Sequence, residues 1–581
     1  MQLKKLSLAL ATAGVWWLGN GVASAAEEVQ LAETQIEDAE QQKKVKARLE
    51  EIKAEEKAAA KAASGYYVER RSYGTQKETE PPKYVKQANK TWLKDYDTFA
   101  DVDWLDIGFE HRARFESRQN DFRRARENID EPLLLRTRAF VGLKNILDPF
   151  RFAVEVQDSR RNHSDYNSST DRRLSSDPRD INHADFLQAY LELYFKESIF
   201  GKDDLGNNRP FWVRGGRLAW EDLDRRLIAR NEWRNTTNTF QGIRANIGEK
   251  KNDWQLEAFA VQPVQRFASE LDQVDHAQKF YGLVGDWRRW SEYVTIQPYY
   301  FYLKQDGDKV KYDGNGSAYS DRSVSPSPLA YTAIQEARAQ VDREINTAGI
   351  RVFGVIPGTQ WDYDAAYNKQ WGHVQRFIGT TVAAGRYINV DHDAYAYNAE
   401  VGYTFNKHAW KPRFSASYGV ASGDHVSGGN TNTDTSDNQG FDRLFGFARP
   451  WSNNDYVQMN NIRAAKVRVE FDPKVPFLDN VKVDTGFSWY RLDDATDRWA
   501  AGNNLQDATG RSGSDLGKEY DLRVRFPLNQ YASLNLGYAH FWAGDFVQDA
   551  VSASANNRTA FDQNRSDSSD FFYTELTLLG F

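Results

Sequence analysis

The stretch Leu105–Arg118 constrains the fold more than any other part of the chain, because polar and apolar residues alternate along it with a period of two. One face carries Leu105, Ile107, Phe109, Ala113 and Phe115, and the other carries Asp106, Glu110, Arg112, Arg114, Glu116 and Arg118. His111 interrupts the apolar face in its middle. Such a strand is typical of a barrel wall between lipid and water, because ionised groups are costly to bury without water or partners.

The composition agrees with a barrel rather than with a helical membrane protein. The chain has 581 residues, of which 27% are charged and 14% are aromatic. A high aromatic share in so polar a chain suits a lipid-facing surface that is built from alternate residues instead of long apolar runs. Because the sequence contains no Cys, disulfide frameworks and thiolate metal sites are excluded.

The first residues form a secretory signal. Lys4-Lys5 precede an apolar run over Leu6–Leu18, and Ala23-Ser24-Ala25 follows as a small-residue cleavage site. We therefore expect residues 1–25 to be removed and the mature chain to start near Ala26. Loss of the two lysines changes the formal net charge from −7 to about −9. The net charge of a mildly acidic protein does not favour binding of polyanions. Any such binding therefore depends on positive charge gathered locally in a pore.

Two further segments precede the repeated strand pattern. Residues 26–64 are rich in Ala, Glu, Lys and Gln, and apolar residues recur at helical spacing, which predicts a charged periplasmic helix. This helix is either a solvated extension or a docking segment for an envelope partner, such as a short coiled coil. Residues 65–99 are interpreted as a linker or plug-like segment, and Ser64–Trp92, which contains Pro81 and Pro82, is expected to have no fixed structure.

The alternation recurs through the rest of the chain, so residues 100–581 are predicted to form an all-β, closed antiparallel transmembrane barrel. Short turns alternate with long polar loops, and an even number of strands places both ends of the barrel on the periplasmic side. The chain ends on Phe581, which resembles the C-terminal assembly signal of outer-membrane barrels. About eighteen segments show the pattern, each near the roughly 9–11 residues that a tilted strand needs to cross a membrane: Leu105–Arg118, Leu135–Lys144, Phe152–Asp158, Leu187–Phe195, Trp212–Trp220, Thr239–Ile247, Trp254–Val261, Phe280–Trp287, Tyr293–Leu303, Gly349–Gly354, Trp361–Gly372, Tyr395–Phe405, Arg413–Ser422, Ala465–Phe471, Val481–Tyr490, Tyr520–Phe526, Leu534–Trp542 and Phe572–Phe581.

The order of motifs resembles the alginate-export family of outer-membrane porins over roughly Ala100–Phe581. The residues that carry the likeness are LRTR at Leu135–Arg138, VRGGRLAWEDLDRRLIARNEWRNTTNTFQGIR at Val213–Arg244, KPRFSASYGVASGD at Lys411–Asp424 and GKEYDLRVRF at Gly517–Phe526. The resemblance implies an eighteen-stranded monomeric barrel that passes an anionic polysaccharide through an Arg-rich constriction. That constriction would be gated by a long extracellular loop and a periplasmic turn. The residues that match its arginine positions in kind, together with two from the first strand, are Arg112, Arg114, Arg136, Arg138, Arg217, Arg244, Arg413, Arg523 and Arg525.

These arginines have two interpretations. A guanidinium is a planar, permanently charged fork that holds a carboxylate with two hydrogen bonds, so a row of exchangeable sites would concentrate a polyuronate. Alternatively, the arginines pair with inward acids in an ion-pair lattice that only fills the barrel. The acids expected on the inner face include Glu110, Glu116, Glu155 and Glu192.

Other classes of function are also considered. The expected function is an outer-membrane channel for anionic polysaccharide, and the alternatives are a general porin for small anionic solutes or a scaffold barrel for an envelope partner. With no nucleophile motif and no His-centred cluster, an enzyme is not expected, nor is a nucleic-acid partner or a cofactor. The Asp- and Asn-rich stretch Ser427–Asp442 is either a flexible extracellular loop or a site for structural Ca²⁺. Aromatic residues at strand ends, such as Trp220 and Trp542, are expected in the interfacial girdle.

Overall fold

The computed structural model describes residues 65–68, 80–122, 129–164, 180–268, 270–309, 337–338, 340–447, 452, 454–502, 505–553 and 567–581. The chain divides into two units, Met1–Gly65 and Tyr66–Phe581, and the second contains the barrel. The signal peptide predicted at residues 1–25 and the helix predicted at residues 26–64 lie outside the described residues.

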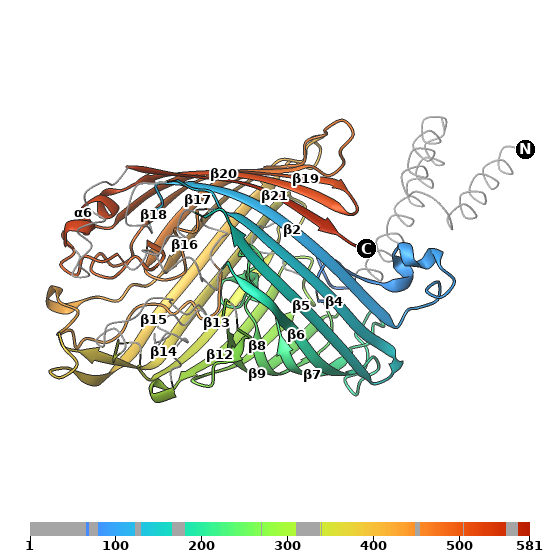
Figure 1. Ribbon diagram of the computed structural model, residues 1–581, viewed down its shortest axis with the longest axis horizontal. Helices are drawn as coiled ribbons and strands as arrows, with labels where there is room; N and C mark the ends of the chain where they lie inside the picture. The colour runs from blue at the N-terminus through green and yellow to red at the C-terminus, as the bar shows by residue number, and fades with distance from the viewer. Residues whose placement is uncertain are drawn as a thin grey trace, which may run out of the picture. The chain divides into compact units, whose positions relative to one another are not determined.

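The described part of the second unit is a closed antiparallel barrel of eighteen long strands (Figure 1). The first of them, β2, pairs with the next, β4, and also with the last, β21, so the sheet has no free edge. Each strand predicted from the alternation has one counterpart, which confirms the barrel. The strands are β2 (Leu105–Gln119), β4 (Leu133–Leu147), β5 (Phe150–Asn162), β6 (Asn182–Phe195), β7 (Phe211–Leu218), β8 (Phe240–Ile247), β9 (Trp254–Gln265), β11 (Gln278–Trp287), β12 (Thr295–Gln305), β13 (Arg343–Val355), β14 (Trp361–Ile378), β15 (Arg386–Thr404), β16 (Arg413–Ala421), β17 (Ile462–Phe471), β18 (Lys482–Arg491), β19 (Asp515–Asn529), β20 (Ala532–Ala543) and β21 (Ser568–Leu579).

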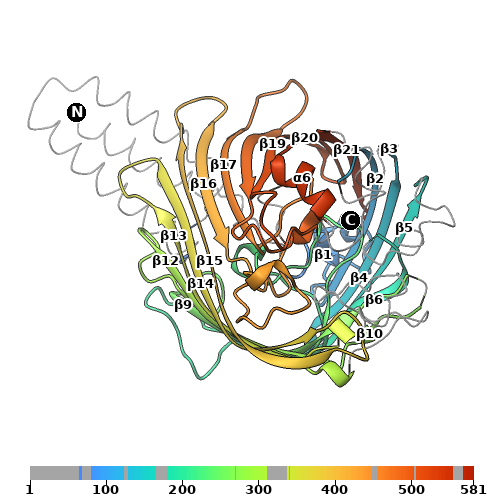
Figure 2. The same cartoon turned by 90° about the vertical axis from the view of Figure 1, so that its left-hand side faces the viewer.

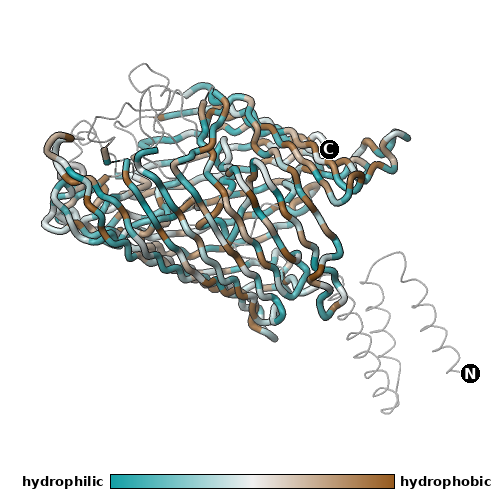
Figure 3. The backbone as a smooth tube through the Cα atoms, turned by 90° about the horizontal axis from the view of Figure 1, so that it is seen from below, coloured by the Kyte–Doolittle hydropathy of each residue, from teal (hydrophilic) through white to brown (hydrophobic). Residues whose placement is uncertain are grey.

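The two faces of the wall differ in polarity, as the sequence predicts. Hydrophilic and hydrophobic residues alternate along the strands in Figure 3. On β2, Phe109 is 39% exposed at the outer face, whereas Arg112 is 3% exposed at the inner face. The charged face of β2 therefore points into the barrel and its apolar face points out.

Several strands are longer than the alternation predicts. β15 begins at Arg386, well before the expected Tyr395, and its ladder with β14 continues to the pair Ile378 and Arg386. The alternation marks only the part of a strand that crosses lipid, because beyond that band both faces are wet and polar residues occupy both. Backbone pairing continues past that limit.

The two ends of the barrel differ in their connections. Short turns, such as the one between β19 and β20, lie at the end where the C-terminus meets the start of β2, and long connections lie at the other end (Figure 1). Short turns face the periplasm in outer-membrane barrels. Figure 2 looks onto the other end, where α6 (Asp545–Ala553) lies. Among the described residues, no helix is long and apolar enough to cross a membrane.

Part of the stretch expected to lack fixed structure is ordered. β1 (Val85–Gln87) pairs with β2, and the 3-10 turns η3 (Ala88–Lys90) and η4 (Trp92–Asp95) follow it. The indole of Trp92 donates to the main-chain oxygen of Gly580 at 3.0 Å and stacks on Phe581. The expectation of no fixed structure for Ser64–Trp92 is thus wrong over residues 80–92, because strand pairing and aromatic stacking anchor this segment to the barrel.

The remaining short elements lie in the connections between the wall strands. They are β3 (Ile129–Asp130), β10 (Gln273–Val274), η6 (Leu223–Arg225), η7 (Gly307–Lys309), η8 (Ser427–Gly429) and η9 (Ala500–Gly502). The largest buried apolar cluster joins inward side chains of the wall, such as Phe280 and Phe301, to loop residues such as Ile228 and Phe445. The interior is therefore partly filled by connections that fold inward.

Candidate functional site: the lumen arginines and the loop they hold

The inner faces of β2 and β4 gather four arginines. The antiparallel register sets Arg112 opposite Arg136, and Glu110 opposite Arg138. Residues Arg112, Arg114, Arg136 and Arg138 are each between 1% and 3% exposed. Glu110 accepts a hydrogen bond from Arg136 at 2.8 Å. Two strands with the same alternation thus place four guanidinium groups side by side on the inner wall.

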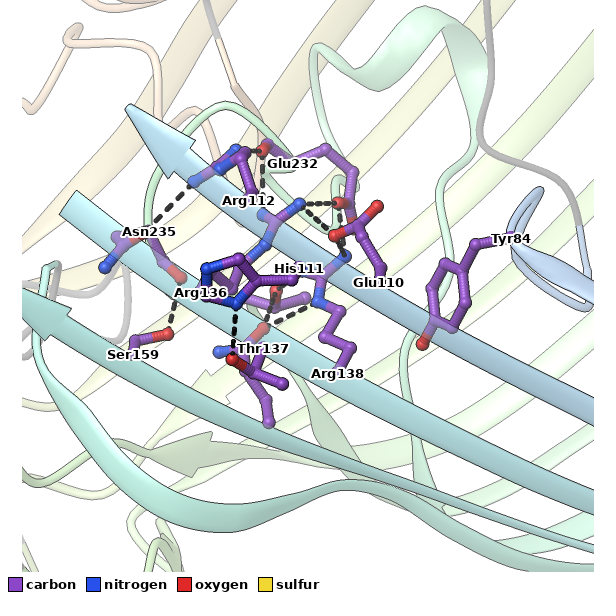
Figure 4. A network of polar contacts seen from close by, with 12 residues as sticks. Tyr84, Glu110, His111, Arg112, Arg136, Thr137, Arg138, Ser159, Glu232 and Asn235 are labelled. Carbon is purple, nitrogen blue, oxygen red and sulfur yellow. Dashed lines mark hydrogen bonds and ion pairs between the residues drawn. The ribbon is translucent and has the colours of Figure 1, made fainter. Parts of the chain in front are cut away.

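The chain between β7 and β8, residues 219–239, folds into the barrel and is here called the inward loop. Arg112 donates to the main-chain oxygen of Glu232 at 2.9 Å, and Arg114 donates to that of Trp233 at 2.5 Å. The guanidinium of Arg114 also lies 3.9 Å from the centre of a Trp233 ring. The wall arginines therefore hold the main chain of the inward loop, as Figure 4 shows for Arg112.

Asn235 fixes the same loop to the wall. Its side-chain amide donates to the main-chain oxygens of Leu135 at 3.0 Å and Asp180 at 2.8 Å, and its side-chain oxygen accepts from Arg112 at 3.2 Å. The hydroxyl of Ser159 donates to the main-chain oxygen of Asn235 at 2.7 Å (Figure 4). Asn235 is 0% exposed, so these bonds replace all of its contact with water.

The carboxylate of Glu232 is held by three arginines. It lies 2.6 Å from Arg138, 3.4 Å from Arg136 and 2.9 Å from Arg230 of its own loop. Burial by itself would raise the pKa of Glu232, but the three guanidinium groups hold it well below the ordinary value. The loop thus carries an acid that is ionised at neutral pH into the arginine cluster.

On its other side, the inward loop meets a second segment, residues 441–447, between β16 and β17. Ala229 donates its main-chain N–H to the main-chain oxygen of Phe445 at 3.2 Å. The ring of Phe445 packs against Phe240 and Phe280 with centroid distances of 5.1 and 4.9 Å. The inward loop therefore bridges the interior from the β2–β4 wall to this segment.

Arg244 lies on the inner face of β8 beside Arg214 of β7. Arg244 donates to Glu257 at 2.6 Å and Arg214 donates to Glu192 at 2.7 Å, so each has an acid of the wall as a partner. Both also donate to Glu80, which precedes β1, at 2.7 to 2.8 Å. The pair thus binds one carboxylate that does not belong to the wall.

Glu155 on β5 is a junction between the N-terminal residues and the inward loop. It accepts from the hydroxyl of Tyr84 at 2.6 Å, from Gln188 at 2.5 Å and from Arg230 at 3.0 Å. Both burial and the neighbouring carboxylate of Glu155 raise the pKa of Tyr84, so Tyr84 stays a hydrogen-bond donor.

The other predicted arginines of the barrel wall are engaged in ion pairs. Arg523 and Arg525 lie 2.9 and 3.5 Å from the carboxylate of Asp484. Arg413 is 0% exposed and lies within 3.3 Å of three carboxylates, those of Asp362, Glu400 and Glu470. The predicted acid Glu116 likewise lies 2.8 Å from Arg114 and 3.0 Å from Arg118. These arginines and acids therefore form ion pairs with one another, as in the ion-pair lattice that is one of the two interpretations of the sequence.

Arg217 does not share the face of the other predicted arginines. It pairs in register with Ala189, one step away from the face that carries Arg214. Gly216 between them has φ +137°, and a Cβ there would lie 2.3 Å from the Ala189 oxygen, so only glycine fits. Arg217 instead donates to the main-chain oxygen of Asp272 at 3.0 Å. Its assignment to the pore lining is corrected, and Arg214 takes that place.

Trp220 is also placed differently from the expectation. It is 1% exposed and packs on Phe240 and Phe259 with centroid distances of 4.9 and 5.2 Å. Because the chain turns into the barrel directly after β7, Trp220 leaves the wall before it reaches the lipid interface. Trp542, in contrast, is 43% exposed, as expected of a girdle residue.

The Asp-rich stretch Ser427–Asp442 forms contacts within the protein. Asp434 lies 2.6 Å from Arg376, which also lies 2.8 Å from Asp424. Within the described ranges, no group of three or more His, Cys, Asp and Glu residues is arranged to hold a metal ion. The Ca²⁺ site stays a prediction.

Sequence reasoning missed four charged residues of this site, namely Arg214, Arg230, Glu232 and Glu80. The first three lie in the stretch Val213–Arg244 that carries the family likeness. A signal was present there, because a run that combines several arginines with apolar residues such as Leu227 and Ile228 is unusual for an exposed loop. Glu80 gave no signal, since it stands in a segment that was interpreted as unstructured.

The closed wall of eighteen strands, with an apolar outside and an ionised inside, defines the chain as a porin-type channel barrel of the Gram-negative outer membrane. It belongs to the alginate-export family: the family described as Alginate export matches residues 103–561. The proteins of this family are transport barrels and not enzymes. None of the curated proteins matches the chain.

Several solved porins are similar in structure at low sequence identity. OccAB2 of Acinetobacter baumannii is similar over 82% of this chain and 97% of its own, with 11% identity and a TM-score of 0.49. OccAB1 of the same organism is similar over the same shares, with 11% identity and a TM-score of 0.48. OpdK of Pseudomonas aeruginosa, solved with vanillate, is similar over 81% and 98%, with 10% identity and a TM-score of 0.46.

Proposed function

We propose that this outer-membrane channel passes an anionic saccharide of the polyuronate class along its arginine-bearing inner wall. The observation that carries the proposal is the environment of Glu232. Its carboxylate arrives on a loop, not on the wall, and Arg136 and Arg138 of the wall receive it at 3.4 and 2.6 Å. A uronate offers the same two oxygens to the same guanidinium forks.

The wall arginines suit transport better than tight binding. Arg136 is shared between Glu110 and Glu232, and Arg138 between Glu232 and Gln157. Because each guanidinium already has protein partners, an arriving carboxylate exchanges one charge-assisted hydrogen bond for another. Exchange of this kind keeps the net affinity of each site low, so that a polymer moves from one site to the next.

A second candidate function is passage of small anionic solutes. It is favoured by the contact between the inward loop and residues 441–447, where Phe445 is 1% exposed. A polymer requires this bridge to move aside, whereas a small solute requires only a path beside it.

The test is single-channel current in a planar bilayer with polymannuronate added, and with a neutral dextran of matched length as the control. The proposal expects reversible block by polymannuronate and none by dextran. Current that is indifferent to polymannuronate overturns it in favour of a general porin. The absence of any open current overturns it in favour of a scaffold barrel.

A further inference from the structure

Glu80 lies outside the residues that match the family, 103–561, and yet its side chain reaches the inner wall. Its two carboxylate oxygens accept from Arg244 at 2.8 and 2.7 Å, and one of them also accepts from Arg214 at 2.8 Å. Neighbouring strands β7 and β8 thus offer two guanidinium groups to a single carboxylate.

In both arginines, one terminal nitrogen donates to an acid of the wall and the other donates to Glu80. The Nη2 of Arg214 donates to Glu192 and the Nη2 of Arg244 donates to Glu257, both of which belong to the wall. The Nη1 of each arginine donates to Glu80. The wall therefore builds a two-armed carboxylate site by itself, and Glu80 is its occupant.

Aromatic rings hold both arms in place. The guanidinium of Arg214 lies 4.2 Å from the ring of Tyr190 and 4.7 Å from a ring of Trp212. That of Arg244 lies 5.3 Å from Trp212 and 4.9 Å from Trp220. Cation–π contacts of this kind fix the direction of the Nη1 groups before a ligand arrives.

The occupant is tethered close to its site. β1 pairs with β2 through Val85 opposite Gly108, so the chain is anchored only a few residues after Glu80. A short tether gives a weak ligand a high effective concentration. Burial would raise the pKa of Glu80, but Arg244 and Arg214 lower it to about 2, so the carboxylate is ionised at neutral pH.

We infer that the Nη1 groups of Arg214 and Arg244 form a subsite for one carboxylate of a sugar acid, and that Glu80 is a tethered competitor which the sugar acid displaces. This inference rests on the proposed function, because it assumes that a sugar acid enters the lumen. It adds a subsite near the end of the barrel where β1 pairs with β2. Because Glu80 occupies this subsite, the apparent affinity for the sugar acid is lowered.

The test compares block of single-channel current by glucuronate in the full-length wild type and in Glu80→Gln. The blocking constant is the glucuronate concentration that gives half-maximal block. Removal of the competing carboxylate is expected to lower this concentration about tenfold, the factor that corresponds to one charge-assisted hydrogen bond. Adding Arg244→Gln to Glu80→Gln is expected to abolish this gain. Glu344→Gln is the matched control, because Glu344 pairs with Lys304 at an exposed site and shares no partner with Glu80. Neutral glucose is the control ligand.

The outcomes separate the inference from the proposed function. Equal glucuronate constants in wild type and Glu80→Gln, with block by polymannuronate intact, overturn the inference alone. Absence of block by either acid in every variant overturns both. Glu80→Asp keeps the charge and shortens the tether by one methylene, so its constant is expected between those of the wild type and Glu80→Gln. It provides the comparison if Glu80→Gln fails to assemble, and a constant equal to that of the wild type then counts against the inference.

Discussion

Replacement of Asn235 by Ala tests whether the wall holds the inward loop in the lumen. The change removes the two amide hydrogens that the main-chain oxygens of Leu135, Arg160 and Asp180 share, and one bond from the Arg112 guanidinium. With about 1 kcal/mol for each amide hydrogen and about 2 kcal/mol for the charged bond, the loss is roughly 4 kcal/mol. That loss shifts the equilibrium between the held and the released loop by about a thousandfold.

The assay for Asn235→Ala is single-channel recording. Release of the loop from the β2–β4 wall is expected to raise the open-level conductance and to add slow fluctuations between levels, because the loop no longer keeps one position. The control is Asn529→Ala, since Asn529 bonds only locally to the amide of Tyr531 in an exposed turn. Conductance and current noise equal to the wild type in Asn235→Ala would refute the claim that these bonds hold the loop across the lumen.

Three further predictions follow from buried groups. Phe445→Ala empties a 1% exposed site and is expected to cost about 3–5 kcal/mol, measured as a lower urea midpoint for barrel unfolding. Arg413→Ala leaves three carboxylates without their shared cation and is expected to cost about 3–5 kcal/mol in the same assay; an unchanged midpoint would contradict the lattice. Burial raises the pKa of Asp497 from 3.8 to about 7. The nearby charge of Asp424 also raises this pKa, whereas Arg498 lowers it. As pH rises, Asp497 loses its proton at a lower pH in the unfolded loop than in the folded loop, so the stability of the loop falls from about pH 4 to about pH 7. Amide exchange near Asp497, corrected for intrinsic rate, is therefore expected to be faster at the upper pH.

The fold was predictable because successive residues of a barrel strand face lipid and lumen in turn, so apolar and polar residues alternate in the sequence. Leu105–Arg118 shows this most clearly: Phe109 lies outside and Arg112 inside, as the alternation requires. The same rule located every wall strand, but it did not give their full lengths. β14 and β15 continue to Ile378 and Arg386, beyond the lipid band, where polarity no longer distinguishes the faces.

The partners of the lumen arginines were not predictable in the same way. Alternation places Arg136 and Arg138 on the inner face, but their contact with Glu232 depends on how the inward loop folds. No local rule gives the path of such a loop, because it is set by tertiary hydrogen bonds such as those of Asn235. Arg217 was assigned to the pore lining from the family likeness, but it lies three residues from Arg214, so a period of two places it on the other face, where it pairs with Ala189.

The most direct test of an arginine-lined anion path is the reversal potential under a salt gradient. The wild type is expected to prefer anions, and the combined variant Arg136→Glu and Arg138→Glu is expected to lose or reverse that preference, because two positive charges of the inner wall become negative. A wild-type channel that prefers cations, or a variant with unchanged selectivity, would contradict the account.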